Sequence, residues 1–515
     1  MTNRKFMRSL DVFDTALLRR TYLPDDIFKL VEEKVGKNFY EKRVEAERKA
    51  REKKRFYGIK DIYKFLPEFD MEVEIETERE NIYPNKELLN EVYDYRNTVF
   101  ISDMYLPSKV IEEFLEDAGY ENPRVFVSCE MKACKADGSL FKKAQEHLGL
   151  TISQHYGDNY AADIEGAKRA GIKNVVFRPA LHNKDYNLPK VRNTFLKKYL
   201  AVVEDECSSS LNKLALYYAP IIFEFTKWIL NQRQAGQKIY FLSRDMYMPY
   251  LIARDIFEAD DIYYLKVSRR SLACLGLKSR NNEVKRKLSF IFTADEIKKK
   301  RTQDDFETLR YLKKFDIADN DIIADIGYAG TIQAIIDNAL RINTQGLYMQ
   351  VSSNVIEGIK TKMFLKRLAI HYCLMVEFVF GSNEDSVEGY KNLRPVYVKD
   401  NQERKELAQE IIGTIMSIAQ NFYYDNFIAG KGFDVFDLEQ ILIHQQYYLS
   451  DDLIKIYNKK IYSNRERKES IIGYDREEIM QGNLRDLYNR SYCQPLFKML
   501  LERDSELKHL SRLLR

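Results

Sequence analysis

Four short polar motifs, each at or near the end of an apolar run, constrain the fold of this chain more than any other feature. In chain order they occupy residues 9–15, 99–102, 135–141 and 157–163. Together they supply a carboxylate nucleophile, a hydroxyl, an ammonium and a pair of carboxylates suited to a metal ion. Phosphoryl transfer requires these groups, because the phosphorus atom needs a nucleophile and its oxygens need positive charge. The ordered set therefore predicts one site assembled from four segments.

The sequence around these motifs alternates between two apolar patterns. Strand-like runs cover residues 6–12, 98–102, 124–127, 154–157 and 174–177. Helical patterns cover residues 108–118, 139–148 and 163–170, and a charged insert between the first two motifs adds helices over 25–35 and 40–55. Such alternation predicts an α/β unit with a mostly parallel sheet, whose ligands bind at the carboxyl ends of the strands. We expect most of the insert to be a solvated face or a lid.

A second alternating region follows a proline-bounded exit segment at 179–189 and a polar break at 205–210. Its strand-like runs cover residues 238–242, 262–267, 322–326 and 346–351, with helices after the first and the third. From about residue 402 to residue 515 the pattern is helical and has no catalytic signature. We therefore expect three parts, namely residues 1–186, with an insert over about 16–97, residues 205–400, and residues 401–515.

Composition excludes several classes of protein. A net charge of +4 over 515 residues predicts no nucleic-acid partner. The six cysteines lack zinc-binding spacing, so we expect reduced thiols in a cytoplasmic protein. The first residues do not have the pattern of a signal peptide. Glu224 and Lys227 interrupt the most apolar stretch, residues 214–230, and we expect no transmembrane segment.

Residues 5–180 resemble the haloacid dehalogenase superfamily through all four of its motifs. In that family the first aspartate of motif one attacks phosphorus and becomes an aspartyl phosphate, and Asp11 is its counterpart here. The resemblance implies that Ser102 and Lys135 hold the phosphoryl oxygens. It also implies a Rossmann-like core, a helical cap formed by the insert, which excludes water, and a Mg²⁺ site. The metal-binding positions carried over from the family are Asp11, Phe13, Asp158 and Asp163.

One position departs from the family pattern. The second aspartate of motif one normally acts as general acid and base, and Phe13 replaces it here. Asp14 lies one residue further on, where a strand would direct it to the opposite face. We expect another carboxylate to protonate the leaving oxygen, and the candidates are Asp103, Glu45 and Glu47.

The departure leaves other activities open. They are a slow phosphatase, a metal-independent dehalogenase-like reaction and a domain that only binds. Each aspartate, taken singly, would also suit a helix cap or a turn. The ordered set of motifs and the retained lysine and acidic pair favour phosphate hydrolysis.

A second strand–loop–helix motif occupies residues 321–336. Its loop is Gly327, Tyr328, Ala329, Gly330 and Thr331, whose glycines let backbone amides approach an anion at a helix N-terminus. This loop is similar to that of type I phosphoribosyltransferases, where a strand-end acid holds the ribose and a Gly/Thr turn holds its 5-phosphate. The resemblance gives Asp325 the ribose-holding, catalytic role. Those enzymes usually carry two adjacent acids, whereas Asp325 stands alone.

Two further strand ends carry charged and hydroxyl groups. Ser243, Arg244 and Asp245 follow the run at 238–242, and Arg269 and Arg270 follow the run at 262–267. Because arginine suits multidentate contact with phosphate, we expect these residues to hold the pyrophosphate of phosphoribosyl pyrophosphate. The alternative is that the arginines form interdomain salt bridges and the glycines only turn the chain.

The whole arrangement resembles bacterial proteins of polysaccharide biosynthesis, such as those of O-antigen or capsule, that install ribofuranose. The resemblance implies transfer of 5-phosphoribose from phosphoribosyl pyrophosphate to a lipid-linked glycan acceptor, then removal of the 5-phosphate. It places the protein in the cytoplasm or at the inner face of the membrane, with other glycan-assembly enzymes as further partners. Glu377 is then either a paired core residue or a base that activates the acceptor. The alternatives are a sugar-phosphate phosphatase with a non-catalytic second half, and a scaffold that docks partners through its helical tail.

Overall fold

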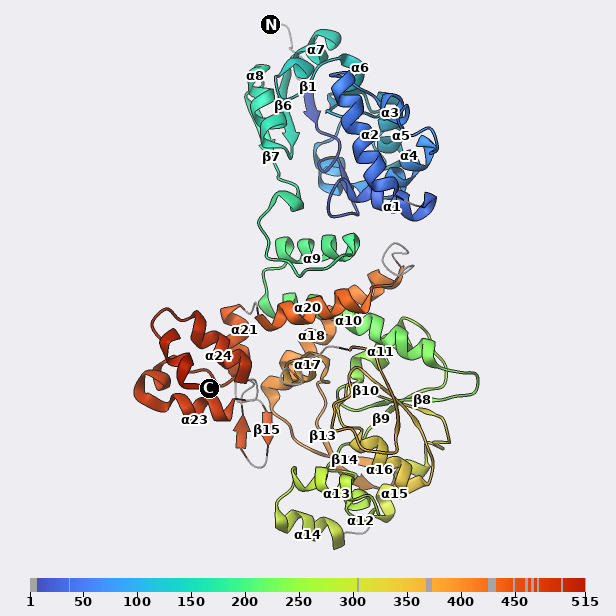
Figure 1. Cartoon of the computed structure of the whole chain (residues 1–515), viewed down its shortest axis with the longest axis vertical. Helices are drawn as coiled ribbons and strands as arrows, with labels where there is room; N and C mark the ends of the chain where they lie inside the picture. Colours follow the sequence, from blue (N-terminus) through green and yellow to red (C-terminus); the bar gives the residue numbers. More distant parts are fainter. Residues whose placement is uncertain are drawn as a thin grey trace. The chain divides into compact units, whose positions relative to one another are not determined.

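We describe a computed structural model of the chain, which forms two compact units (Figure 1). Unit 1 comprises Met1–Leu188 and Thr194–Asp205, and unit 2 comprises Pro189–Asn193 and Glu206–Arg515. Each unit contains a parallel five-stranded sheet with helices around it, which confirms the α/β class. The structure describes residues 7–36, 38–302, 305–366, 373–424, 432–447, 450–458, 462–464, 467–469, 472–491 and 494–514.

The sheet of unit 1 has the strand order β5-β4-β1-β6-β7. Its strands are β1 (Met7–Leu10), β4 (Thr98–Ser102), β5 (Val125–Val127), β6 (Ile152–Gly157) and β7 (Asn174–Phe177). The helices that follow them are α5 (Ser108–Asp117), α6 (Ser128–Met131), α7 (Ser139–Leu148), and α8 (Gly166–Arg169) with the preceding π-turn η2 (Tyr160–Glu165). The strands expected at 98–102 and 174–177 and the helix expected at 139–148 are confirmed with the same bounds.

Both faces of this sheet are covered, as the alternation of strands and helices predicts. All five residues of β4 are buried. Phe100 packs in one hydrophobic cluster with Phe114 of α5, whereas its neighbour Ile101 packs in another with Phe141 of α7. Successive side chains of a strand point to opposite faces, so one apolar strand joins two cores.

The strand order of unit 1 reverses between β1 and β6. The chain runs from β1 to β4 and β5 on one side, and then crosses to β6 and β7 on the other. In open α/β sheets, such a reversal leaves a crevice at the carboxyl ends of the two strands, where ligands bind.

The insert of unit 1 is closed by an antiparallel pair, β2 (Leu17–Arg19) with β3 (Ile82–Pro84). Its helices are α1 (Asp26–Val35), α2 (Phe39–Lys53), α3 (Ile59–Tyr63) and α4 (Met71–Glu80). The expectation of a mostly solvated insert missed a buried charge network. Arg43 of α2 is fully buried and donates hydrogen bonds to Glu74 of α4 at 2.7 and 2.9 Å.

The sheet of unit 2 has the strand order β12-β11-β10-β8-β9. Its strands are β8 (Ile239–Leu242), β9 (Ile262–Leu265), β10 (Ile322–Asp325), β11 (Gln345–Tyr348) and β12 (Lys360–Met363). The order reverses between β8 and β10, which places a second crevice at their carboxyl ends. Sequence patterns did not predict β12, because it is a polar edge strand without a buried residue.

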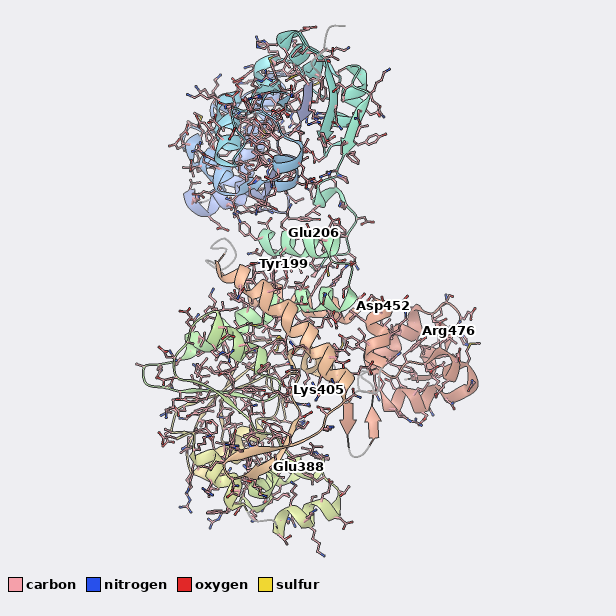
Figure 2. All side chains as sticks on the ribbon, turned by 180° about the vertical axis from the view of Figure 1, so that it is seen from behind. Tyr199, Glu206, Glu388, Lys405, Asp452 and Arg476 are labelled. Atoms are coloured by element: carbon pink, nitrogen blue, oxygen red, sulfur yellow. The ribbon has the colours of Figure 1, made fainter. Side chains whose placement is uncertain are left out.

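The helices of unit 2 surround this sheet and continue to the end of the chain (Figures 1 and 2). Up to β12 they are α10 (Ser210–Gln232), α11 (Tyr247–Asp255), α12 (Ala273–Lys278), α13 (Asn282–Ser289), α14 (Ala294–Thr302), α15 (Phe306–Lys313) and α16 (Thr331–Leu340). After β12 come α17 (Cys373–Phe380), the hairpin β13 (Ser386–Lys391) and β14 (Arg394–Val398), α18 (Gln402–Tyr424), α20 (Val435–Tyr447) and α21 (Asp451–Asn458).

The last elements are the hairpin β15 (Tyr462–Asn464) and β16 (Arg467–Glu469), α22 (Arg476–Glu478), η5 (Ile479–Asn483), α23 (Leu484–Arg490), α24 (Gln494–Arg503) and η6 (Lys508–Leu514). Figure 2 marks Lys405 on α18, Asp452 on α21 and Arg476 on α22. The region expected as a separate helical part packs into unit 2, since α18 and α20 both lie against the long helix α10. Among the described helices, none combines the length and the apolar character of a membrane span.

Candidate functional site

The four sequence motifs of unit 1 meet at the reversal point of its sheet. Asp11 follows β1, Ser102 ends β4 and Asp158 follows β6, so all three lie at carboxyl strand ends. Lys135 Nζ lies 2.5 Å from Asp11 Oδ1 and 2.6 Å from Asp163 Oδ1. Ser102 and Lys135 are both buried. The arrangement brings a buried carboxylate and an ammonium into direct contact.

Three carboxylates of this site lie close together. Asp11, Asp158 and Asp163 each offer a carboxylate oxygen, and these atoms all lie within 4.8 Å of one another. Burial and the like charges of its neighbours raise the pKa of Asp158 to about 8. Burial also raises the pKa of Asp11, although Lys135 opposes that shift. The single lysine therefore does not fully offset burial and the repulsion between the like charges of the cluster.

Neighbours of opposite charge stabilise the ionised forms of Lys135 and Asp163. Burial disfavours the charged form of Lys135, but the neighbouring carboxylates outweigh it and raise the pKa of the ammonium. Burial opposes ionisation of Asp163 as well, but Lys135 and His155 prevail and hold the pKa of this carboxyl below its usual range. Lys135 and Asp163 thus form a charged pair inside the protein, with Asp11 as the second carboxylate on the lysine.

Sequence patterns missed one residue of the site, His155 on β6. Its ring contacts Asp163 through Nε2 at 3.1 Å and Ser9 through Nδ1 at 2.8 Å, and it is fully buried. The only signal in the sequence was a histidine inside an apolar strand, which is also compatible with an ordinary core residue. His155 and Lys135 therefore contact the same oxygen of Asp163, and together they hold this carboxylate in place.

Glycine is required where Asp163 meets β6. A Cβ atom at Gly157 would lie 2.2 Å from the Asp163 side chain. The same carboxylate accepts a hydrogen bond from the backbone N–H of Asn159 at 2.9 Å. The fourth motif therefore folds back on its own strand end, and this fixes the spacing between Gly157 and Asp163.

The donor set fits a hard divalent cation. Asp11, Asp158 and Asp163 supply carboxylate oxygens within reach of one another, and Mg²⁺ binds through one or two carboxylates together with phosphate and water oxygens. Phe13 has only its backbone carbonyl to offer, because its ring packs in the hydrophobic core. A bound cation would offset the repulsion between like charges that helps to raise the pKa of Asp158.

Phe13 has no acidic group, and Asp14 cannot act as the missing general acid without rearrangement. The Phe13 ring lies under the Arg19 guanidinium, 4.6 Å from ring centroid to Cζ. Asp14 adopts a left-handed backbone conformation, with φ of 56°, and its carboxylate pairs with Arg19 at 2.6 Å. Asp14 is therefore already engaged in an ion pair.

The second crevice, between β8 and β10, contains three carboxylates from three elements. Asp245 follows β8, Asp325 ends β10 and Glu377 lies on α17. Burial and the like charge of Asp245 raise the pKa of Glu377 to about 8. Burial and the like charges of Asp245 and Glu377 raise the pKa of Asp325 well above its usual range. Burial raises the pKa of Asp245 as well, against nearby arginines. Within the described parts of the chain, no cationic side chain is hydrogen-bonded to any of the three.

The anion loop of unit 2 requires both of its glycines. Gly327 has φ of 145° and Gly330 has φ of 69°, both in the region that favours glycine. A Cβ at Gly330 would lie 2.2 Å from Ile359 Cδ1, and a Cβ at Gly327 would lie 2.5 Å from the Gln350 carbonyl oxygen. Gly330 caps the ten-residue helix α16, which begins at Thr331. The half-buried loop thus leads directly to a helix N-terminus, where anions are favoured.

Three of the predicted pyrophosphate ligands have partners within unit 2. The Ser243 hydroxyl donates to the Val267 carbonyl at 2.8 Å and so ties β8 to the end of β9. Arg244 forms an ion pair with Asp400. Arg270 lies 3.5 Å from Glu296. Arg269 is exposed, and its charge acts on all three carboxylates of the crevice.

Among the described residues, Arg269 is the arginine of this set without an ion pair. The partners of Arg244 and Arg270, Asp400 and Glu296, both lie in unit 2. These two ion pairs are therefore not the interdomain salt bridges considered as an alternative. Comparison of the sequence with protein-family models and with curated proteins gives no match.

Proposed function

We propose that this chain carries out two consecutive steps of glycan assembly. Unit 2 transfers 5-phosphoribose from phosphoribosyl pyrophosphate to a glycan acceptor, and unit 1 removes the 5-phosphate to leave ribofuranose. The observation that carries the proposal is the contact of Lys135 with both Asp11 and Asp163 at the reversal point of the first sheet. That contact sets a carboxylate beside a fixed positive charge, and covalent phosphoryl transfer needs a nucleophile together with positive charge near the phosphoryl oxygens.

In the phosphatase step, an Asp11 oxygen forms a bond to phosphorus while the bond from phosphorus to the ribose 5-oxygen breaks. Lys135 stabilises the negative charge that develops on the phosphoryl oxygens, and the Ser102 hydroxyl donates to one of them. Water then hydrolyses the aspartyl phosphate and regenerates Asp11. Mg²⁺, held by Asp11, Asp158, Asp163 and the Phe13 carbonyl, would neutralise further phosphate charge.

In the transfer step, an acceptor hydroxyl attacks the anomeric carbon of ribose as pyrophosphate leaves. The exposed Arg269 and the amides at the start of α16 are the groups available to hold phosphate oxygens. Asp325 would accept hydrogen bonds from the ribose hydroxyls. Glu377, with a pKa of about 8, is suited to take the proton of the acceptor hydroxyl near neutral pH.

The decisive experiment follows both products in one reaction. Purified protein is incubated with phosphoribosyl pyrophosphate, Mg²⁺ and a panel of synthetic or lipid-linked glycans, and pyrophosphate and inorganic phosphate are quantified over time. We expect pyrophosphate to appear first and phosphate second. Absence of both products with every glycan would reject the proposal.

A sugar-phosphate phosphatase with a non-catalytic second unit is the main competitor. The engagement of Ser243 and Arg244 in contacts within unit 2 favours this alternative, because it removes two expected ligands of pyrophosphate. Thermal unfolding separates the two proposals through ligand linkage. Phosphoribosyl pyrophosphate should stabilise the two-step enzyme, whereas stabilisation by a sugar phosphate alone would favour the competitor.

A further inference from the structure

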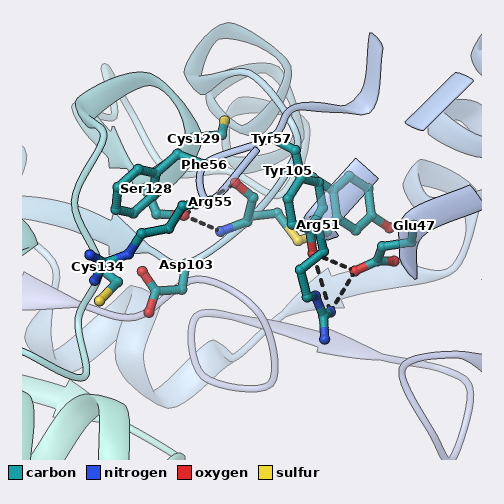
Figure 3. A pocket seen from close by; sticks show the side chains of 11 residues that line it. Glu47, Arg51, Arg55, Phe56, Tyr57, Asp103, Tyr105, Ser128, Cys129 and Cys134 are labelled. Carbon is teal, nitrogen blue, oxygen red and sulfur yellow. Dashed lines mark hydrogen bonds and ion pairs between the residues drawn. The ribbon is translucent and has the colours of Figure 1, made fainter. Parts of the chain in front are cut away.

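A pocket of about 450 Å³ opens in unit 1 beside the phosphoryl-transfer site (Figure 3). Its walls come from the end of α2 and the loop after it, from the loop that follows β4, and from α6 with the loop after it. Its lining includes arginines, aromatic rings and one aspartate, namely Arg51, Arg55, Phe56, Tyr57, Tyr105 and Asp103. Aromatic rings and arginines together suit a polar, ring-shaped ligand such as a sugar.

Asp103 connects this pocket to the phosphoryl-transfer site. It directly follows Ser102, and both of its carboxylate oxygens lie 3.0 Å from the backbone nitrogen of Lys135. The side chain of the same lysine contacts Asp11. A carboxylate on the pocket wall is therefore adjacent, through the backbone, to both residues expected to hold the phosphoryl oxygens.

The structure separates the three carboxylates that sequence patterns left as candidates for the missing acid. Glu45 is half-buried on α2, pairs with Arg48 at 2.6 Å and does not line the pocket. Glu47 does line it, but pairs with Arg43 at 2.9 Å and accepts a hydrogen bond from Tyr57 at 2.7 Å. Asp103 has no ion pair with a side chain in the described part of the protein.

Electrostatics order the three candidates in the same way. Burial raises the pKa of Asp103, although Lys135 opposes the shift. The pKa of Glu47 is lowered, because its hydrogen bond from Tyr57 and its arginine partners outweigh burial. The hydrogen bond from Arg48 lowers the pKa of Glu45 to about 2. The proton needed by a general acid is therefore held best on Asp103.

We propose that Asp103 is the general acid of the phosphatase step and that this pocket receives the sugar end of a phosphorylated glycan. The inference rests on the phosphatase function proposed above. As Asp11 bonds to phosphorus and the ester bond breaks, the electron pair stays on the ribose 5-oxygen and the Asp103 proton moves to that oxygen. The resulting carboxylate then accepts a proton from the water that attacks the aspartyl phosphate.

Leaving-group dependence tests the assignment. An alkyl ester, ribose 5-phosphate, needs a proton on its leaving oxygen, whereas p-nitrophenyl phosphate does not. We expect Asp103→Asn to lower kcat/KM for ribose 5-phosphate by ~10²–10⁴-fold and to leave that for p-nitrophenyl phosphate nearly unchanged. This constant reports the steps through departure of the leaving group, so slow hydrolysis of the aspartyl phosphate does not obscure the result.

The matched control is Glu45→Gln, which removes a carboxylate that lies outside the pocket. It should leave the ratio of the two constants unchanged. Equal losses on both esters in Asp103→Asn, no loss on either, or an ester-selective loss in Glu47→Gln instead would overturn the assignment. Because both esters are measured on one preparation, a partly unfolded variant does not alter the ratio. A wild-type protein that hydrolyses neither ester would instead reject the phosphatase function itself.

Discussion

The two crevices of the molecule differ in how their carboxylates are paired with cationic side chains. In unit 1, one lysine lies within 2.6 Å of two carboxylates, and burial with the neighbouring like charges raises the pKa of the third, Asp158, to about 8. In unit 2, Asp245, Asp325 and Glu377 face arginines without a hydrogen bond to any of them among the described residues. The first crevice therefore holds a lysine ion pair before its ligand arrives, whereas the second favours protonated acids until positive charge enters with the ligand.

The comparison implies that the two chemistries are separable by mutation, and the largest expected effect is at Asp11. Asp11→Asn removes the proposed nucleophile of unit 1, so phosphate release should fall by about 10³-fold or more. Pyrophosphate release should continue, and mass spectrometry should detect a glycan that retains the 5-phosphate. Loss of pyrophosphate release in the same variant would mean that the two crevices do not act independently.

The reciprocal change should stop the other step. Asp325→Ala removes the strand-end carboxylate of unit 2, and we expect pyrophosphate release to fall by about 10²-fold. Hydrolysis of p-nitrophenyl phosphate by unit 1 should be unaffected. Asp316→Ala offers a matched control, since Asp316 is an exposed aspartate of the same unit. A similar loss in both variants would assign the effect to stability rather than to the ribose-binding role.

Cation binding should distinguish the crevices without any substrate. Mg²⁺ at 100 times its dissociation constant should stabilise the wild-type protein by ~2.7 kcal/mol, as measured by unfolding with and without a chelator. Asp158→Asn should reduce this stabilisation, because it removes one of the three clustered carboxylates. Stabilisation that survives Asp158→Asn in full would place the cation elsewhere.

The smallest effect concerns the pH dependence of unit 2. The folded protein raises the pKa of Glu377 from 4.5 to about 8, so between these values the folded state holds a proton that the unfolded chain has lost. Stability attributable to Glu377 is therefore present below pH 4.5 and declines as pH rises to about 8. Glu377→Gln should lack this decline, by about 1 kcal/mol between pH 6 and pH 7. Parallel stability curves for the two proteins would contradict the shifted pKa.

Sequence patterns predicted the parts of each crevice that follow local rules. Apolar runs located the strands that end at Ser102 and Asp325, and glycines marked the loop before α16. They could not predict His155 behind Asp163 or the pairing of Arg244 with Asp400, because those contacts join residues that are distant along the chain or ambiguous in type. The choice among acids required tertiary contacts for the same reason.

The buried Arg43 has a consequence for which substitutions the pocket of unit 1 can accept as the sequence evolves. Its guanidinium lies 4.8 Å from the centroid of the Tyr105 ring and is bound by Glu74, so the wall near Tyr105 is anchored from within the insert. Arg55 and Phe56 take no part in that anchor. Substitutions at these two outer positions could therefore shift ligand preference while the supporting frame keeps its shape, whereas a single change at Arg43 would leave Glu74 as an uncompensated buried charge.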